Sequence, residues 1–326
     1  MSMPSGDANA TRRSFLGMLA PAALRAQEPI PIGFFGPADA AHARGGSVYM
    51  GLALAMEDAN RAGGYQGRPF RLISRWSDDP WRGGAAAAVR LVFDDRVCAL
   101  IGGIDGATTH LAEQVIAKAL VPLIDPASTD QTVNHAGVPW IFSLAPADPA
   151  IAACLVEVVR DSPFTLVAGT DHDSRNLAAE VIRAARRRRV FPALRIDIAP
   201  GTRRLPQGQD VEGACVLIAP PGETAAIAGA LPGNALIAAG PSARSRICSA
   251  CPGLVSPALR RPDAGLSARL FDRFRQQPDD FSLLAYDAAR SLIEAVQASG
   301  PDRALIRQEL AARFGPNGRK EQKVAL

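Results

Sequence analysis

Charge of one sign, aromatic residues, long apolar runs and cysteine are all scarce in this chain of 326 residues. The formal net charge is only +4, from 36 basic and 32 acidic residues, whereas nucleic-acid-binding proteins concentrate basic residues on one surface. Aromatic residues make up only 6% of the chain, which argues against a groove for stacked bases. No apolar run reaches the ~20 residues that span a bilayer. These absences argue against a nucleic-acid partner and against a membrane-spanning helix.

The motifs of common enzyme classes are also missing. The sequence has neither the G-x-S-x-G elbow of many hydrolases nor the phosphate loop G-x-x-x-x-G-K-[ST]. Gly102 and Gly103 are adjacent, so they do not form the dinucleotide-binding pattern G-x-G-x-x-G. No histidine stands in a motif that pairs it with a serine or cysteine nucleophile. We therefore predict that the chain is not an enzyme and uses no cofactor.

The five cysteines are an odd number, so at least one is unpaired within the chain. Cys98, Cys154 and Cys215 lie in apolar runs, which is typical of small core residues. Cys248 and Cys251 form a Cys-x-x-Cys pair, which suggests a zinc half-site, a redox pair or a local disulfide. No second pair or nearby histidine completes a zinc site, and the Pro/Gly-rich surroundings differ from those of redox motifs. A local structural disulfide is the favoured interpretation.

Residues 1–26 have the pattern of an export signal. Arg12 and Arg13 precede Ser-Phe-Leu and an apolar stretch, and the small residue Ala26 follows it. A charged start, a short apolar middle and a small-residue end are typical of such signals. The paired arginines resemble the twin-arginine pattern of bacterial export. We expect cleavage near Ala26 and export to the periplasm; an N-terminal amphipathic helix is the alternative.

After this segment, short β-branched runs alternate with Ala-rich amphipathic stretches. Such alternation predicts parallel sheets whose strands are connected by helices. Two series of this kind predict two doubly wound α/β lobes, with the ligand-binding loops at the carboxyl ends of the strands. The predicted strands span 30–35, 70–76, 97–104, 121–125, 140–145, 164–169, 194–199, 214–219 and 235–240.

Several loops that follow predicted strands offer polar groups for a ligand. The loop 104–109 precedes a helix whose free N–H groups suit an anionic group; helix capping by Thr108 or its neighbours is the alternative. The next loop offers the hydroxyls of Ser128 and Thr129, or is only a polar turn. Asp148 begins another predicted helix, either as its N-cap or as a carboxylate that faces the cleft.

Asp171, His172 and Asp173 follow the first strand of the second series. Two aspartates and a histidine are potential metal ligands, but close sequence neighbours on one loop seldom all point inward. We therefore predict no metal site. The arginine run 186–189 lies at a predicted helix end, which favours a solvated terminus over a nucleic-acid patch.

Six segments occur in a familiar order: IPIGFFGP, GLALAMEDANRAGGYQGRPFRLI, ALIGGIDGATT, VPLIDPASTDQT, AYDAARSLIEAV and FGPNGRK. In this order and spacing the chain resembles type I periplasmic solute-binding proteins of the Leu/Ile/Val (branched-chain amino acid) class. The resemblance implies a monomer without catalysis that closes on a small solute and presents it to an ABC permease and ATPase complex. A ligand-sensing or accessory module with the same fold is the alternative.

The resemblance also implies how the chain divides into lobes. Residues 27–145 and about 256–313 would form lobe 1, and residues 146–255 and about 314–326 would form lobe 2. The stretch 201–212 is too short for the helix expected between two strands of lobe 2. A reduced second lobe is therefore expected.

Further positions follow from the resemblance alone. Gly106, or Asp105 if the loop is one residue shorter, falls where the family has a serine that holds the ligand carboxylate. Ala107 and Thr108 are the neighbouring ligand-binding positions in this loop.

Ser128 and Thr129 fall in the second carboxylate-binding loop of the family, and Asp148 falls where an aspartate binds the α-amino group. Asp173 and Arg44 occupy positions that are often aromatic. The missing serine and these two departures favour a polar amino acid or amide, with a carboxylate and a donor group, over leucine.

Overall fold

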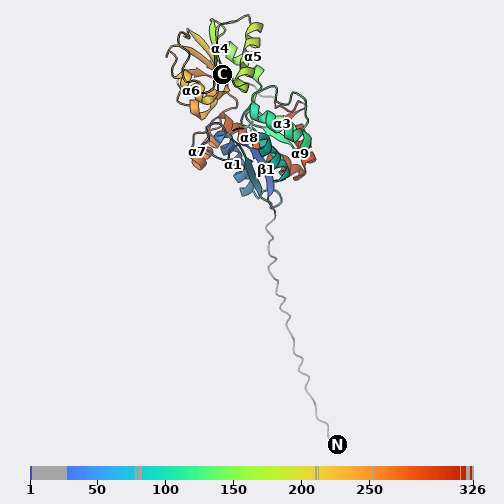
Figure 1. Ribbon diagram of the computed structural model, residues 1–326. Helices are drawn as coiled ribbons and strands as arrows, with labels where there is room; N and C mark the ends of the chain where they lie inside the picture. The colour runs from blue at the N-terminus through green and yellow to red at the C-terminus, as the bar shows by residue number, and fades with distance from the viewer. Residues whose placement is uncertain are drawn as a thin grey trace.

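The computed structural model describes residues 1, 28–77, 79, 83–209, 211, 213–251, 253–315, 317–320 and 324. Two α/β lobes lie against each other, and the chain enters the first of them at β1 (Figure 1). The predicted export signal and its cleavage near Ala26 fall outside the described residues. Within the described residues, no helix is both long and apolar enough to cross a membrane.

The first sheet contains five parallel strands in the order β2-β1-β3-β4-β5. Alternate strand residues face opposite sides, so Ile32 and Phe34 pack with one set of helices while Leu100 and Leu123 pack with another. Helices α1 and α8 cover the first side, and α2 and α3 cover the second. The elements are β1 (Ile30–Phe35), α1 (Gly46–Arg61), β2 (Phe70–Arg75), α2 (Ala85–Phe93), β3 (Ala99–Gly102), α3 (Gly106–Ala119), β4 (Leu123–Asp125), β5 (Ile141–Ser143), α7 (Ala264–Phe274), α8 (Asp280–Ser299) and α9 (Arg303–Phe314).

The second sheet also has five parallel strands, in the order β10-β9-β8-β6-β7. Helices α4 and α5 pack on one side of it, and α6 packs on the other. The elements are α4 (Asp148–Val158), β6 (Phe164–Gly169), α5 (His172–Arg187), β7 (Pro192–Ile198), β8 (Ala214–Ile218), α6 (Pro221–Ala228), β9 (Leu236–Ala239) and β10 (Leu254–Val255). Both sheets therefore have the doubly wound α/β architecture that the sequence predicts.

Aspartate side chains begin five of these helices. In α8, the N-cap Asp279 accepts a hydrogen bond from the Ser282 N–H (3.0 Å), and the Ser282 hydroxyl accepts one from the Asp279 N–H (2.9 Å). Such caps satisfy N–H groups that the helix itself leaves free. The aspartate N-caps are Asp105 on α3, Asp171 on α5, Asp263 on α7, Asp279 on α8 and Asp302 on α9.

The chain passes from one sheet to the other between β5 and α4 and again between β10 and α7. Residues near the carboxyl end then return to the first sheet. The Ser143 N–H donates to the Gly318 carbonyl (2.8 Å), and the Lys320 N–H donates to the Ser143 carbonyl (3.1 Å). These bonds place residues 318–320 beside β5, whereas the resemblance had put the segment about 314–326 in lobe 2.

The connection from β7 to β8 contains no helix in its described residues, as its short length predicts. Leu205 and Val211 from this connection pack against the sheet instead, together with Val167 and Leu217. An irregular segment therefore covers the part of the sheet for which a helix was expected.

The predicted disulfide is wrong for this structure, in which Cys248 and Cys251 are both free. The Cys248 thiol donates to the Pro221 carbonyl (3.4 Å), and the Cys251 thiol donates to the Ala225 carbonyl (3.9 Å). Each thiol thus bonds to a different carbonyl oxygen of α6. Cys98 and Cys215 are buried core residues, as predicted.

Candidate functional site

A cavity lies between the two lobes at the carboxyl ends of strands from both sheets. On the first lobe, Ile104 and Asp105 follow β3, and residues 127–129 follow β4. On the second lobe, the lining comes from the segments that follow β6, β8 and β9. Parallel α/β sheets bind their ligands at these strand ends. The cavity is therefore the candidate ligand-binding site.

The structure brings some of the predicted site residues into this cavity and places others behind it. Arg44, Asp105, Ser128, Thr129 and Asp173 line the cavity. Gly106, Ala107, Thr108 and Asp148 are not among the lining residues. Three of these four, Gly106, Thr108 and Asp148, bond to residues that do line the cavity.

Thr108 belongs to the cap of α3. The Asp105 carboxylate accepts hydrogen bonds from the N–H (2.9 Å) and the hydroxyl (2.7 Å) of Thr108. The other carboxylate oxygen forms an ion pair with Arg44. Arg44 therefore already has an anionic partner at the mouth of the cavity.

The first amide of α3 is bound by a carboxylate of the chain itself. The Gly106 N–H donates to the Asp173 carboxylate of the second lobe over 2.8 Å. A Cβ atom on Gly106 would lie 2.3 Å from that carboxylate oxygen and 2.8 Å from the Cβ atom of Asp130. Burial, followed by the negative charge of Asp105, raises the pKa of Asp173 to about 7. Only a residue without a side chain allows Asp173 to approach position 106 so closely. The Gly106 N–H, which was expected to bind a ligand carboxylate, is already bonded to Asp173.

The second expected carboxylate loop is likewise satisfied from within. The buried Asp125 carboxylate accepts the N–H groups of Ala127 (3.1 Å) and Ser128 (3.0 Å). The Ser128 hydroxyl accepts the Asp130 N–H (3.1 Å). Burial raises the pKa of Asp125 to about 7. The expectation that these backbone donors hold a ligand carboxylate therefore does not fit the observed hydrogen bonds.

Asp148 is the first residue of α4 and lies behind Thr129. Its N–H donates to the Thr129 carbonyl (2.7 Å), and its buried carboxyl oxygen Oδ2 has no hydrogen-bond partner among the described residues. Asp148 is only 1% exposed, and this burial raises its pKa well above the ordinary value. Ala147 precedes it as N-cap, so Asp148 is neither the cap nor part of the cavity lining.

Sequence analysis missed Arg246, which also lines the cavity. Its N–H donates to the buried Asp279 carboxylate (2.9 Å), while its guanidinium contacts the His42 carbonyl (3.3 Å) and the Met50 sulfur (3.9 Å). No carboxylate of the described residues forms an ion pair with this guanidinium. A single arginine in a Pro/Gly-rich loop gave no motif from which its place could be predicted.

The two lobes touch on one side of this cavity, where α3 and the loop after β4 meet α5. Besides the Gly106–Asp173 bond, His172 and Asn176 contact Asp130, and Gln131 bonds to Glu180. We call this set of residues the lobe contact. It consists of Gly106, Asp130 and Gln131 from the first lobe and His172, Asp173, Asn176 and Glu180 from the second.

The two-lobed architecture and this interlobe cavity agree with a comparison of the sequence with known families. The family described as "Periplasmic binding protein" matches residues 29–246. The chain belongs to the periplasmic binding protein family. The family implies a periplasmic location, and its members are solute-binding proteins rather than enzymes. Both agree with the sequence analysis.

Among curated proteins, an "Amino acid binding protein" of Pseudomonas aeruginosa is 34% identical over 122 residues. This match covers 36% of the chain and 32% of the relative, so the chain matches about a third of that protein's length.

Solved structures with the same fold include branched-chain amino acid binding proteins. The substrate-binding protein LivJ of Streptococcus pneumoniae, in complex with isoleucine, has a TM-score of 0.79 at 18% identity, covering 90% of this chain and 93% of its own. The leucine-binding protein LivK of Thermotoga maritima has a TM-score of 0.70 at 20% identity, covering 86% of each chain. At these identities the likeness shows the fold, a type I periplasmic binding protein fold with two parallel-sheet lobes.

Proposed function

We propose that the chain is the periplasmic solute-binding component of an ABC importer. Its ligand would be an amino acid or a similar small molecule that carries both a carboxylate and a cationic or hydrogen-donating group. The observation that carries this proposal is the interlobe cavity, where the guanidinium of Arg246 and the carboxylates of Asp105, Asp171 and Asp173 line one space. Opposite charges in one cavity suit a ligand that carries both signs.

Arg246 is the cavity residue best suited to bind the ligand carboxylate. Arginine binds carboxylates through two parallel N–H groups, and Arg44, the other arginine of the cavity lining, is already paired with Asp105. The backbone donors at Gly106 and Ser128 are engaged with carboxylates of the chain. The ligand carboxylate therefore moves from the position that the family resemblance implied to the Arg246 side of the cavity.

The acidic residues of the cavity provide the partner for an ammonium or amide group. Asp173 is buried, and burial raises its pKa to about 7. A ligand ammonium nearby would favour the ionised carboxylate and so displace a proton from it. Leu177, Ile218 and Phe281 supply apolar lining for the rest of the ligand. Isoleucine, which is bound in the LivJ structure, and leucine, for which LivK is named, carry an ammonium group but no polar side-chain group for this acidic wall.

The proposal is tested by a thermal-shift screen on the exported form of the protein. The screen covers polar, basic and branched-chain amino acids, amides and simple carboxylates. A ligand at a hundredfold excess over its Kd stabilises the folded state by about 2.7 kcal/mol. A hit among zwitterionic compounds, or among amides that also carry a carboxylate, supports the proposal. A response only to compounds without a carboxylate, or turnover of a compound by the purified protein, would contradict it.

Transport is the part of the proposal that separates it from a sensor or accessory module. Deletion of the gene should abolish uptake of the ligand that the screen identifies, because an importer depends on its binding protein. Unchanged uptake, together with an altered transcriptional or signalling response to that ligand, would favour the sensor. Genes for an ABC permease and ATPase next to this gene would favour the importer.

Replacement of Arg246 by glutamine should weaken binding of a carboxylate ligand by roughly ten- to a hundredfold. A hydrogen bond to a charged group contributes about 1.5–3 kcal/mol, and glutamine cannot replace the paired charge. Isothermal titration with the ligand from the screen measures the change. Arg195→Gln is the control, because Arg195 pairs with Asp197 on β7 and does not line the cavity. Equal affinity in wild type and Arg246→Gln would place the carboxylate elsewhere.

A further inference from the structure

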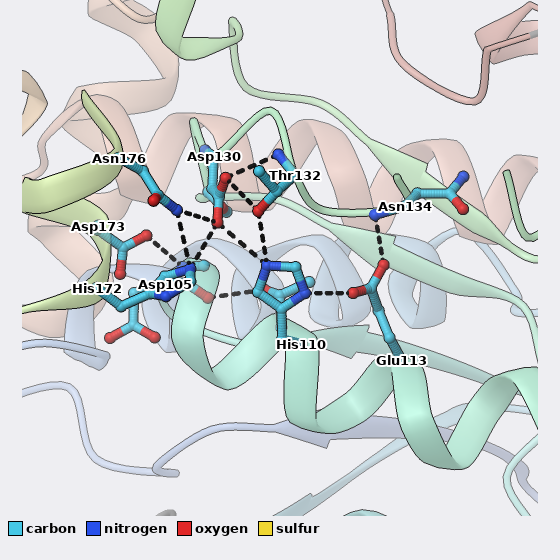
Figure 2. A network of polar contacts seen from close by, with 12 residues as sticks. Asp105, His110, Glu113, Asp130, Thr132, Asn134, His172, Asp173 and Asn176 are labelled. Carbon is cyan, nitrogen blue, oxygen red and sulfur yellow. Dashed lines mark hydrogen bonds and ion pairs between the residues drawn. The ribbon is translucent and has the colours of Figure 1, made fainter. Parts of the chain in front are cut away.

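Two histidines and an aspartate from three separate segments converge at the lobe contact (Figure 2). His110 lies on α3, Asp130 lies in the loop after β4, and His172 begins α5. One ligand atom of each lies within 4.8 Å of the others. The Nε2 atoms of His172 and His110 are 2.8 and 3.1 Å from the same Oδ2 atom of Asp130.

Asp130 is fixed so that this oxygen faces both imidazoles. Its side chain is completely buried. The other oxygen, Oδ1, accepts hydrogen bonds from the N–H (2.7 Å) and the hydroxyl (2.8 Å) of Thr132. Because Thr132 binds Oδ1, the other oxygen, Oδ2, faces His110 of its own lobe and His172 of the second lobe.

The ring of His110 is held by a carboxylate on its far side, as is usual for histidines that bind metals. Its second ring nitrogen, Nδ1, bonds to the carboxylate of Glu113, whose other oxygen accepts the Asn134 N–H. A carboxylate on Nδ1 fixes the orientation of the ring. The Nε2 atom, which lies 3.1 Å from Asp130 Oδ2 and 3.0 Å from the Thr132 hydroxyl, would become the metal ligand once it loses its proton. Figure 2 shows this chain of contacts from Asn134 through Glu113 and His110 to Asp130.

We propose that His110, Asp130 and His172 form a binding site for a divalent transition-metal ion, with zinc as the best fit. Two imidazole nitrogens and one carboxylate oxygen are a common zinc ligand set, with bonds of about 2.0–2.2 Å, so tetrahedral ligand atoms lie about 3.4 Å apart. The observed separations of 2.8 and 3.1 Å would need to widen by roughly 0.3–0.6 Å.

The fourth position is open to water. The side chains of His110 and His172 are 28% and 32% exposed, and a surface hollow lined by His110, Thr132 and His135 adjoins the site. The amide nitrogen of Asn176 lies 3.1 Å from both Asp130 Oδ2 and His172 Nε2. Asn176 therefore lies beside the proposed position of the ion.

The ion would hold the two lobes together. His110 and Asp130 belong to the first lobe, whereas His172 belongs to the second. The three ligands can meet at one ion only when the lobe contact is formed. The metal therefore acts as a clamp that favours the closed arrangement, independently of which solute the cavity binds. The earlier prediction of no metal site considered only the loop that carries His172.

Zinc titration of the chelator-treated protein without solute tests the proposal. Calorimetry at several pH values should detect one zinc ion per chain, with an affinity that rises with pH because protons compete for the imidazoles. His110→Ala and His172→Ala should each weaken zinc binding at least a hundredfold, and Glu113→Gln should weaken it about tenfold. His135→Ala is the matched control, since His135 lines the same hollow but is not one of the three ligands.

Small-angle scattering then tests the clamp. Zinc should make the wild type and His135→Ala more compact, and should leave His172→Ala unchanged. His172→Gln separates ligation from folding, because glutamine retains a hydrogen bond to Asp130 but is a poor zinc ligand. Without zinc, this variant should have the melting temperature and the solute affinity of the wild type, and it should bind no zinc. Solute binding by the zinc-free wild type tests the proposed function separately.

Absence of zinc binding, or binding that survives the double variant His110→Ala/His172→Ala, would overturn the proposal. The thiols of Cys248 and Cys251 are the competing site. Cobalt replaces zinc as a spectroscopic probe, and the proposed nitrogen and oxygen ligands give no thiolate charge-transfer band. Zinc binding that is lost in Cys248→Ser/Cys251→Ser and retained in the histidine variants would assign the metal to the thiols.

Discussion

Replacement of Asp125 by asparagine should remove much of the loss of stability that the protein undergoes between pH 5 and pH 8. Burial raises the pKa of Asp125 to about 7 in the folded chain, against about 3.9 when unfolded. The unfolded chain therefore releases this proton first, and folding becomes less favourable as the pH rises. Between pH 5 and 8 the loss is about 2–3 kcal/mol. Stability from this group is fully present below pH 4 and is lost as the pH passes 7.

Asparagine can preserve the local geometry at this position. Its amide oxygen can accept the N–H groups of Ala127 and Ser128, which both bond to the same Asp125 oxygen. Urea unfolding at pH 5, 6, 7 and 8 measures the free energy of unfolding of each variant. Asp272→Asn, at an exposed position on α7, should keep the pH dependence of the wild type. Parallel curves for wild type and Asp125→Asn would contradict the argument.

Besides Asp148, whose pKa burial also raises well above its ordinary value, two other groups should leave a residual pH dependence in Asp125→Asn. Burial and the charge of Asp105 raise the pKa of Asp173 to about 7, so its contribution is lost over the same range as that of Asp125. Hydrogen bonds to Asp130 and Glu113 raise the pKa of His110 to about 10. The contribution of His110 is present below about pH 6.5 and is lost as the pH rises through 10. Both act at the lobe contact or the cavity wall.

The strands were predictable because burial on both faces selects continuous apolar, β-branched runs. Residues 30–35 and 164–169 form β1 and β6 within the bounds that the pattern predicts. Helix α6 was not predicted, since it is only eight residues long and its Ala/Gly composition has little amphipathic periodicity. Its ends depend on packing against the sheet and the loop after β9, which local sequence does not specify.

The position of the cavity was predictable for a similar reason, because strand direction and alternation determine where loops gather. The side-chain contacts around the cavity could not be predicted in this way. Gly106 and Asp173 lie 67 positions apart, and their bond depends on how the lobes are placed. His110, Asp130 and His172 likewise come from three segments, so no local spacing reveals them. A carboxylate of one lobe that occupies a ligand-binding N–H group of the other, as Asp173 does at Gly106, can be recognised only in a structure that contains both lobes.

Replacement of Gly106 by serine should open the lobe contact. The new Cβ atom would lie 2.3 Å from the Asp173 carboxylate and 2.8 Å from the Cβ atom of Asp130. Overpacking costs about 1–3 kcal/mol, and loss of the Gly106 hydrogen bond to a carboxylate costs a further 1.5–3 kcal/mol. The closed arrangement should therefore lose about 3 kcal/mol, or roughly a hundredfold in the equilibrium between closed and open forms. Small-angle scattering should show an expanded particle.

The clash and the family position of Gly106 make opposite predictions for serine, and the experiment decides between them. If the hydroxyl simply completed a carboxylate site, as the resemblance implies for this position, Gly106→Ser would bind leucine or isoleucine more tightly than the wild type. The clash instead predicts weaker binding of every solute.

Gly222→Ser is the control, because a Cβ atom at Gly222 meets nothing within 4 Å. Removing the nearest clashing atom in Gly106→Ser/Asp173→Ala should restore part of the closure, and it should free the amide at position 106 for a ligand carboxylate. A gain in leucine affinity in this double variant, absent from both single variants, would show that Asp173 excludes the ligand from the start of α3.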